Sequence, residues 1–120
     1  MKYLCMVYFD EKNLDALPRD RFDDLVSKSL AYDDMLRERG QFLAAQALQP
    51  VAAARTLRLS GGKAVVTDGP FAETHEQLGG FLMIDARDMD EAIELASKMP
   101  PLSLGCIEVR PIRELREVTA

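Results

Sequence analysis

The order of predicted strands and helices indicates an α+β protein with a ferredoxin-like split βαβ fold. Three observations carry this prediction: a strand-like amino-terminal segment, two helical segments that each follow or precede a strand, and an alternating strand near the carboxyl end. Two halves of this kind form an antiparallel sheet with two helices on one face. The sequence also predicts an extra β-hairpin between the two halves.

Residues 2–9 contain β-branched and aromatic side chains and end at a polar turn, so they are predicted to form a strand. Residues 18–40 follow a helical period. Pro18 suits the first helical turn, and Gly40 suits the left-handed position after a helix. The stripe expected to face the core comprises Phe22, Leu25, Val26, Ser29, Tyr32 and Leu36.

The middle of the chain is predicted to be all β. Residues 41–50 are ambiguous, and their position after a capped helix favours a strand that stops at Pro50. Residues 54–69 indicate a hairpin that turns at 60–63. A further strand covers 79–86, with its two glycines as boundary residues.

The carboxyl-terminal part adds one helix and one strand. Asp88 and Glu91 form a capping-box pattern at the start of the helix. Residues 105–112 alternate as a strand, and 113–120 are expected to be an irregular or helical end. The predicted buried face of the helix comprises Met89, Ala92, Ile93 and Ala96.

Bulk properties exclude several classes of protein. A chain of 120 residues, 48% of them apolar, fits one domain with its own core. A net charge of −5 argues against nucleic-acid binding, although a small anionic ligand remains open. The first apolar run is too short for a membrane span and lacks a signal-peptide pattern, so we expect a cytoplasmic protein that does not bind membranes.

Both faces of the first strand are apolar. Two helices cover one face of such a sheet, and monomers seldom expose a large apolar patch on the other. A second sheet packed there would bury it, so we predict a homodimer formed sheet against sheet. The alternative is that the tail or the hairpin folds over that face. The faces comprise Tyr3, Cys5, Val7 and Phe9, and Leu4, Met6 and Tyr8.

No metal or cofactor is expected. Cys5 and Cys106 lie in separate apolar segments and are predicted to be reduced core thiols. Two distant cysteines and one histidine cannot form a zinc site. A glycine-rich phosphate loop is also missing from the sequence.

Residues 66–81 contain the candidate catalytic side chains. Asp68 precedes Gly-Pro and either holds the turn, which is the favoured interpretation, or acts as a general base beside a cleft. His75, the only histidine, lies between Glu73 and Glu76. It either transfers protons near neutral pH or is a solvated loop residue.

The candidate binding residues are Arg110, Glu108 and Tyr8. Arg110 and Glu108 share a strand face opposite Ile107 and Val109. On the dimer side, Arg110 can bind a carboxylate or enolate. The equal alternative is a cross-strand ion pair or charges that keep an edge strand soluble. Tyr8 is either a packing aromatic or a hydroxyl donor to a ligand.

Three ordered motifs carry a family resemblance: DGPF at 68–71, LGGF at 78–81 and GCIEVRP at 105–111. With them the chain resembles the DGPF family of YCII-related proteins nearly end to end. The resemblance implies one domain over 1–120 and a dimeric α+β barrel. Such relatives are bacterial, mostly without assigned activity, and some are encoded beside extracytoplasmic-function sigma factors or fused to them. The wider superfamily includes muconolactone-isomerase-like enzymes and a dehydrochlorinase-like YCII protein.

The resemblance is incomplete at the residues that matter for catalysis. YCII proteins closer to the enzymes carry a His–Asp pair at positions that fall near Ser29 and Met99 here, so the pair is missing. The family loop reads ETKE, and His75 occupies the place of its lysine. His75 therefore inherits no catalytic role.

Two functions follow. The first is a homodimer with a cleft for a small, anionic organic metabolite. If it is an enzyme, it performs cofactor-free proton transfer, with Asp68 or His75 as proton carrier and Arg110 as charge stabiliser. The alternative is a non-catalytic interaction or regulatory module linked to an extracytoplasmic-function sigma factor. The sequence does not decide between enzyme and binding protein.

Overall fold

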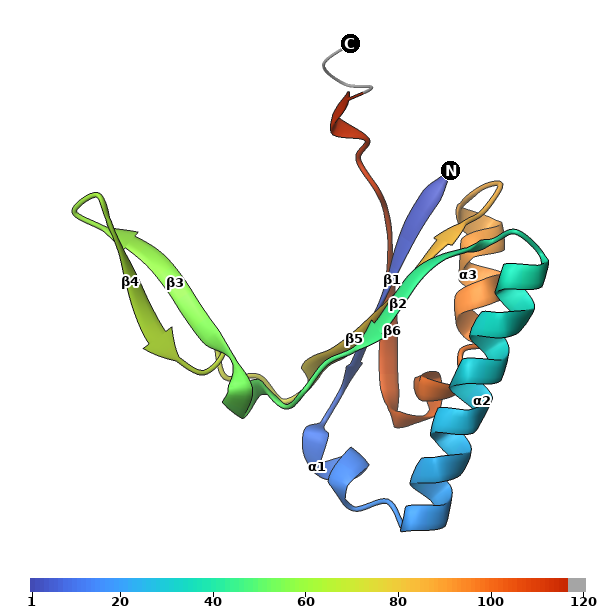
Figure 1. Ribbon diagram of the computed structural model, residues 1–120, viewed down its shortest axis with the longest axis horizontal. Coiled ribbons are helices and arrows are strands. Elements are labelled where there is room, and N and C mark those ends of the chain that lie inside the picture. Colours follow the sequence, from blue (N-terminus) through green and yellow to red (C-terminus); the bar gives the residue numbers. More distant parts are fainter. Residues whose placement is uncertain (117–120) are drawn as a thin grey trace.

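A four-stranded antiparallel sheet carries helices on one face, and a separate hairpin projects from it (Figure 1). The computed structural model describes residues 1–116, so the predicted tail lies partly outside the described residues. The sheet order is β2-β5-β1-β6, which confirms the predicted α+β fold. Its strands are β1 (Lys2–Phe9), β2 (Phe42–Ala47), β5 (Gln77–Asp85) and β6 (Gly105–Pro111). The other elements are α1 (Glu11–Asp15), α2 (Arg19–Glu38), α3 (Met89–Ser97), the hairpin strands β3 (Arg55–Ser60) and β4 (Lys63–Asp68), and the 3-10 turns η1 (Val51–Ala53) and η2 (Pro100–Leu104).

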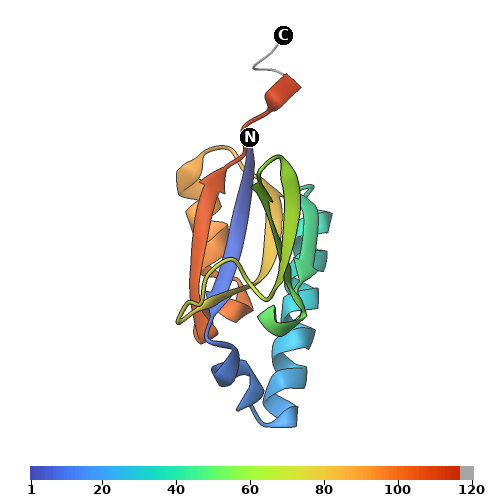
Figure 2. The same ribbon diagram turned by 90° about the vertical axis from the view of Figure 1, so that its left-hand side faces the viewer.

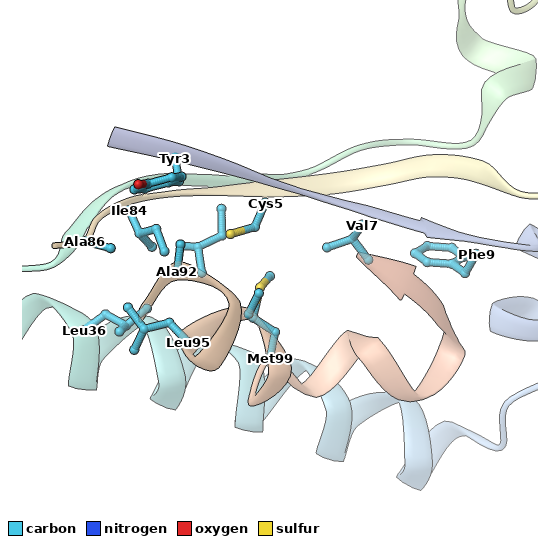
Figure 3. Close-up of a cluster of buried hydrophobic side chains, with 12 residues drawn as sticks. Tyr3, Cys5, Val7, Phe9, Leu36, Ile84, Ala86, Ala92, Leu95 and Met99 are labelled. Atoms are coloured by element: carbon cyan, nitrogen blue, oxygen red, sulfur yellow. The ribbon is translucent and has the colours of Figure 1, made fainter. Parts of the chain in front are cut away.

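The hydrophobic core lies between the sheet and the two long helices (Figure 3). The alternation predicted for β1 is confirmed, because every second side chain of this central strand is buried. Leu82 and Ile84 of β5 extend the same face, and Leu36 of α2 packs beneath it without any solvent exposure. The β1 side chains of this layer are Tyr3, Cys5, Val7 and Phe9.

Local sequence signals set the ends of α2. Pro18 precedes the first helical residue, as predicted. At the other end Gly40 has φ +71°, and its N–H donates to Arg37 O at 3.0 Å, while Gln41 N–H donates to Leu36 O at 2.9 Å. This pair of bonds is a Schellman motif, which only glycine enters without strain.

The buried face of α3 differs in part from the prediction. Asp88 caps the helix by accepting a hydrogen bond from Glu91 N–H at 2.9 Å, as expected. Ile93, however, is 51% exposed, and Leu95 is buried in its place. The reason is that α3 packs on α2 as well as on the sheet: Tyr32 Oη of α2 donates to Leu95 O at 2.6 Å.

Helix α1 was not expected from the sequence, which indicated a turn after β1. Asp10 starts it, because its carboxylate accepts a hydrogen bond from Lys12 N–H at 3.0 Å. Glu11 then ties the helix to its surroundings: its N–H donates to Gln77 Oε1, and its carboxylate accepts from Val51 N–H. These contacts join residues far apart in sequence, so local pattern gave no sign of them.

The two glycines of β5 lie inside the strand, so their prediction as boundary residues was wrong. Val7 pairs with Gly80 and Tyr8 with Leu78, which makes Gly79 the extra residue of a β-bulge. A side chain at Gly79 would meet the Phe9 ring, and one at Gly80 would meet a backbone oxygen of β2. Both glycines allow close packing.

The second face of the sheet carries no helix. We call it the open face; it comprises Leu4, Met6, Tyr8, Leu78, Phe81 and Met83, with Cys106, Glu108 and Arg110 along β6. The thiol of Cys106 is exposed there, so its prediction as a core residue was wrong, whereas Cys5 is buried. The alternation of β6 places the side chain of Cys106 on the opposite face from that of Ile107, which is partly buried against the core.

The hairpin stands off from the open face instead of covering it (Figures 1 and 2). Its turn falls at the predicted position, where Gly61 and Gly62 have φ +57° and +80°. Positive φ at both central residues fits the twist of paired strands. The alternative that the hairpin folds over the open face of its own chain is therefore wrong. None of the helices formed by residues 1–116 has the length and apolarity needed to cross a bilayer.

Candidate functional site

A cavity of about 460 Å³ lies between α2 and the helix-covered face of the sheet. Its floor includes Val7 and Phe9, which stand at one end of the core cluster in Figure 3. The amino-terminal half of α2 forms one wall, and η2 forms another. The cavity exists because this half of α2 stands away from the sheet, whereas Leu36 near the other end packs tightly.

The cavity opens to solvent beside α2 and the end of β2. Phe22, Val26 and Leu30, spaced one turn apart on α2, are 37%, 41% and 59% exposed. Leu48, just after β2, is 47% exposed. These side chains line the cavity as well, so they form an apolar rim. The predicted apolar stripe of this helix thus splits into a packed half and a half that borders the cavity.

Asp33 is the only carboxylate among the described residues that line the cavity. It is half-buried, and burial raises the pKa of its carboxyl above the ordinary value, against a smaller lowering by Arg37. Within residues 1–116 this carboxylate has no hydrogen-bond or ion-pair partner. A half-buried carboxylate with no partner is costly, which makes it a candidate functional group.

The other polar groups of the cavity wall are mostly engaged. Ser29 Oγ donates to Leu25 O at 2.8 Å inside α2, and Tyr32 Oη donates to Leu95 O. Burial raises the pKa of Tyr32, so its hydroxyl is neutral near pH 7. The cavity is therefore an apolar space with one available carboxylate.

Ser29 and Met99, the positions near which the family resemblance led us to expect a His–Asp pair, both line this cavity. Neither of them is a histidine or an aspartate. Asp33 lies one helical turn after Ser29, so it places an acid on the same wall.

The predicted catalytic residues lie elsewhere. Asp68 ends β4 and forms an ion pair with Arg55 at 3.0 Å, with its side chain 89% exposed. His75 is 90% exposed, and its Nδ1 is 4.0 Å from an Asp10 carboxylate oxygen. Neither lines the cavity. Gly69, next to Asp68, has φ +90°, so the DGPF motif forms a turn that residues other than glycine would enter only with strain.

The predicted binding residues are together on the open face, on the opposite side of the sheet from the cavity. Arg110 forms an ion pair with Glu108 of the same strand, whereas the alternative that the sequence left open was an ion pair across strands. Tyr8 Oη approaches the sulfur of Met6 at 3.9 Å, a weak contact. Ile107 and Val109 pack against the core as predicted, which confirms the orientation of this strand.

Sequence reasoning missed Asp33, although a signal was present. An acid at position 33 continues the three- and four-residue steps of the apolar stripe from Val26 and Ser29. Acids on such a stripe are unusual, because burial disfavours their charged form. No three His, Cys, Asp or Glu side chains of residues 1–116 are grouped closely enough to hold a metal ion.

The fold and the cavity define an α+β protein of the ferredoxin-like kind with an apolar space of small-molecule size. The chain belongs to the YCII-related domain family, whose model matches residues 1–116. It is 38% identical over 114 residues to the uncharacterized protein R00369 of Rhizobium meliloti (strain 1021), covering 93% of this chain and 92% of the relative.

A solved structure shares the fold. It is 5-chloro-2-hydroxyhydroquinone dehydrochlorinase (TftG) from Burkholderia phenoliruptrix AC1100, in complex with 2,5-dihydroxybenzoquinone. The TM-score is 0.54 at 17% identity, with 94% of each chain covered. At that identity the likeness extends to the fold and no further.

Proposed function

We propose that this protein binds a small, largely apolar organic molecule in the cavity between α2 and the sheet, with Asp33 as the polar contact. The observation that carries the proposal is the unpartnered Asp33 carboxylate on the wall of a 460 Å³ apolar space. Small-molecule sites have volumes of about 300–1,000 Å³ and a few polar groups that orient the ligand. A ligand hydroxyl would supply the partner that Asp33 lacks.

Hydroxylated or quinonoid six-membered rings are the ligand class that fits best. Such a ring is flat and apolar over its faces and carries hydroxyls at its edge, which matches an apolar cavity with one acceptor. TftG, which shares the fold, was solved with 2,5-dihydroxybenzoquinone. Likeness of fold alone is weak support, so this ligand class is inferred from the shape and lining of the cavity.

If the bound molecule reacts, the available chemistry is proton transfer. A carboxyl whose pKa is raised by burial is a better base than an ordinary carboxylate. Asp33 would take a proton from the ligand and return it at another atom in an isomerisation. In an elimination, an anion would leave the ligand and the proton would pass to solvent.

Several sequence predictions stay predictions. Asp68 and His75 as proton carriers, Arg110 as charge stabiliser, the link to a sigma factor and a cytoplasmic location are among them. A homodimer is part of the proposal, supported by the apolar open face, where Leu4, Met6 and the side chains around them lack a covering layer.

A matched pair of variants on α2 tests the cavity. Ser29 lines it, whereas Ser27 is exposed on the same helix and does not. Ser29→Leu should lower the affinity for phenol, hydroquinone and 2,5-dihydroxybenzoquinone at least tenfold by filling space, measured by ligand-observed NMR and calorimetry. Ser27→Leu should leave it unchanged. If the wild type binds none of these probes, or both variants bind alike, the proposal is wrong.

The role of Asp33 has a second test. Asp33→Asn should weaken binding of hydroxylated rings about tenfold, the size of one charge-assisted hydrogen bond, and leave benzene binding unchanged. Asp34→Asn is the control, because Asp34 is exposed and pairs with Arg37. If Asp33→Asn changes the affinity for hydroxylated rings and for benzene equally, Asp33 does not contact the ligand hydroxyl.

A further inference from the structure

The projecting hairpin has one apolar and one polar face. In an antiparallel pair, residues directly opposite each other point to the same side. The β3–β4 register places Leu57 opposite Val66 and Leu59 opposite Ala64 on one side, with the Arg55–Asp68 ion pair at the base of that side. The other side carries Thr56, Arg58, Ser60, Lys63, Val65 and Thr67. We call the first side the apolar face of the hairpin.

The apolar face is open to solvent. Leu57, Leu59 and Val66 are 63%, 80% and 57% exposed. An isolated two-stranded hairpin is only marginally stable in water, and it becomes stable by packing an apolar side on another layer. The hairpin ends in an ordered base, where Gly69 N–H donates to Ala54 O at 2.8 Å. The hairpin is thus well formed and lacks a layer to pack on.

The surface of the whole chain exceeds that of a compact protein of its size. Its accessible area is 8589 Å², whereas a monomer of 13.4 kDa exposes about 6,500 Å². The radius of gyration is 16.5 Å, against about 14 Å for a compact chain of this length. The excess of about 2,100 Å² is the area that each subunit of an obligate dimer buries in a large interface.

Charge also favours a second copy as the partner. Residues 55–68 contain three basic residues and one acid. The remainder of the chain has 12 basic and 19 acidic residues, so a basic hairpin meets an acidic body when two copies associate. The hairpin and the open face lie on the same side of the molecule (Figures 1 and 2). A second copy that covers one would therefore reach the other.

We infer that the hairpin is an exchanged arm: its apolar face packs on the body of a second copy of this chain, whose open face covers the open face of the first. This inference rests on the homodimer of the proposed function. Two-fold symmetry then gives two equivalent arms per dimer. Each arm would add the apolar area of Leu57, Leu59 and Val66 to the contact between the sheet faces, so we expect the arm to control dimer affinity.

A matched pair of double variants tests this assignment. Leu57→Asp with Leu59→Asp adds two charges to the apolar face, and Ser60→Asp with Thr67→Asp adds two to the polar face. Sedimentation equilibrium should give a dimer dissociation constant at least 100-fold higher for the first pair and less than threefold changed for the second. Circular dichroism checks that the body stays folded. Equal effects of the two pairs would overturn the inference.

Cross-linking locates the contact without removing it. Leu59→p-benzoylphenylalanine, irradiated in the full-length protein, should link to the body of a second copy, outside residues 55–68. Links within one chain, or between two hairpins only, would overturn the exchange while leaving a sheet-against-sheet dimer in place. If the wild-type protein is a monomer in solution, the homodimer and the exchange of the arm are both wrong. Neither result bears on ligand binding, because the hairpin does not line the cavity.

Discussion

Gly105→Ala should be strongly destabilising, because β1 and β6 approach each other too closely there for a side chain. A Cβ atom at this position would lie 2.1 Å from Tyr8 O and 2.9 Å from Phe9 Cα. Real Cβ atoms essentially never come within 3.0 Å of such atoms. Since both are backbone atoms of a paired strand, relief requires β1 and β6 to separate by about 1 Å, and overpacking of this kind costs up to about 3 kcal/mol.

Gly79→Ala is the matched control. The Cβ atom there would lie 2.2 Å from Phe9 Cζ, which is as close, but the neighbour is a side chain. Phe9 borders the cavity, so its ring can turn into empty space. A displaced rotamer costs about 1 kcal/mol, so we expect Gly79→Ala to lose about a third as much stability as Gly105→Ala.

Urea unfolding at one fixed protein concentration measures both effects, since dimerisation makes stability depend on concentration. With an m-value of about 1.5–2 kcal/mol/M, the midpoint should fall by about 1.5–2 M for Gly105→Ala and about 0.5 M for Gly79→Ala. Equal midpoints for the two variants would refute the distinction between backbone and side-chain clashes. Gly79→Ala should also weaken ligand binding, because the displaced ring occupies the cavity.

Three other predictions concern titratable groups. Burial raises the pKa of the Asp33 carboxyl in the folded protein. Its contribution to the free energy of unfolding is therefore fully present at pH values below its pKa in the unfolded chain, and this contribution is lost as pH rises through the higher pKa of the folded state. Asp33→Asn lacks this loss, and its urea midpoint should rise relative to wild type between about pH 3 and pH 7. The pKa of Asp88 is lowered mainly by the hydrogen bond from Glu91 N–H, so Asp88→Ala should destabilise at neutral pH. That loss should vanish in urea titrations as pH falls through the lowered pKa. Burial raises the pKa of Cys5 to about 11. In a Cys106→Ser variant the remaining thiol should therefore react with an aromatic disulfide reagent only after denaturation, and reaction of the native protein would contradict this burial.

The sequence predicted most of the secondary structure, because the signals are local. The period of two separated the two faces of β1 and placed Ile107 and Val109 opposite Glu108 and Arg110 in β6, although Cys106 was wrongly expected in the core. Pro18, Gly40 and Asp88 marked helix ends through hydrogen bonds within a few residues of each other. The errors came where partners are distant, as with Ile93, whose exposure depends on how α3 meets α2.

The candidate site was predicted less well than the fold. The glycine motifs drew attention to residues 68–81, but Gly69, Gly79 and Gly105 are explained by backbone conformation and close packing. Asp33 belongs to no motif and was overlooked on a helix that read as a simple amphipathic stripe. Its significance depends on a space beneath it, which the sequence does not encode locally.

By itself, then, the sequence determined the order of the strands and of the two long helices, the two faces of β1, the ends of α2 and the start of α3, and the family. Tertiary structure alone decided three things: α2 stands off the sheet and leaves a cavity, Asp33 borders it, and the hairpin leaves the body on the side of the open face. The physical reason is the distance along the sequence over which each kind of interaction acts. Periodicity and capping depend on neighbours within a turn or two, whereas a cavity and a projecting arm depend on how layers distant in sequence meet.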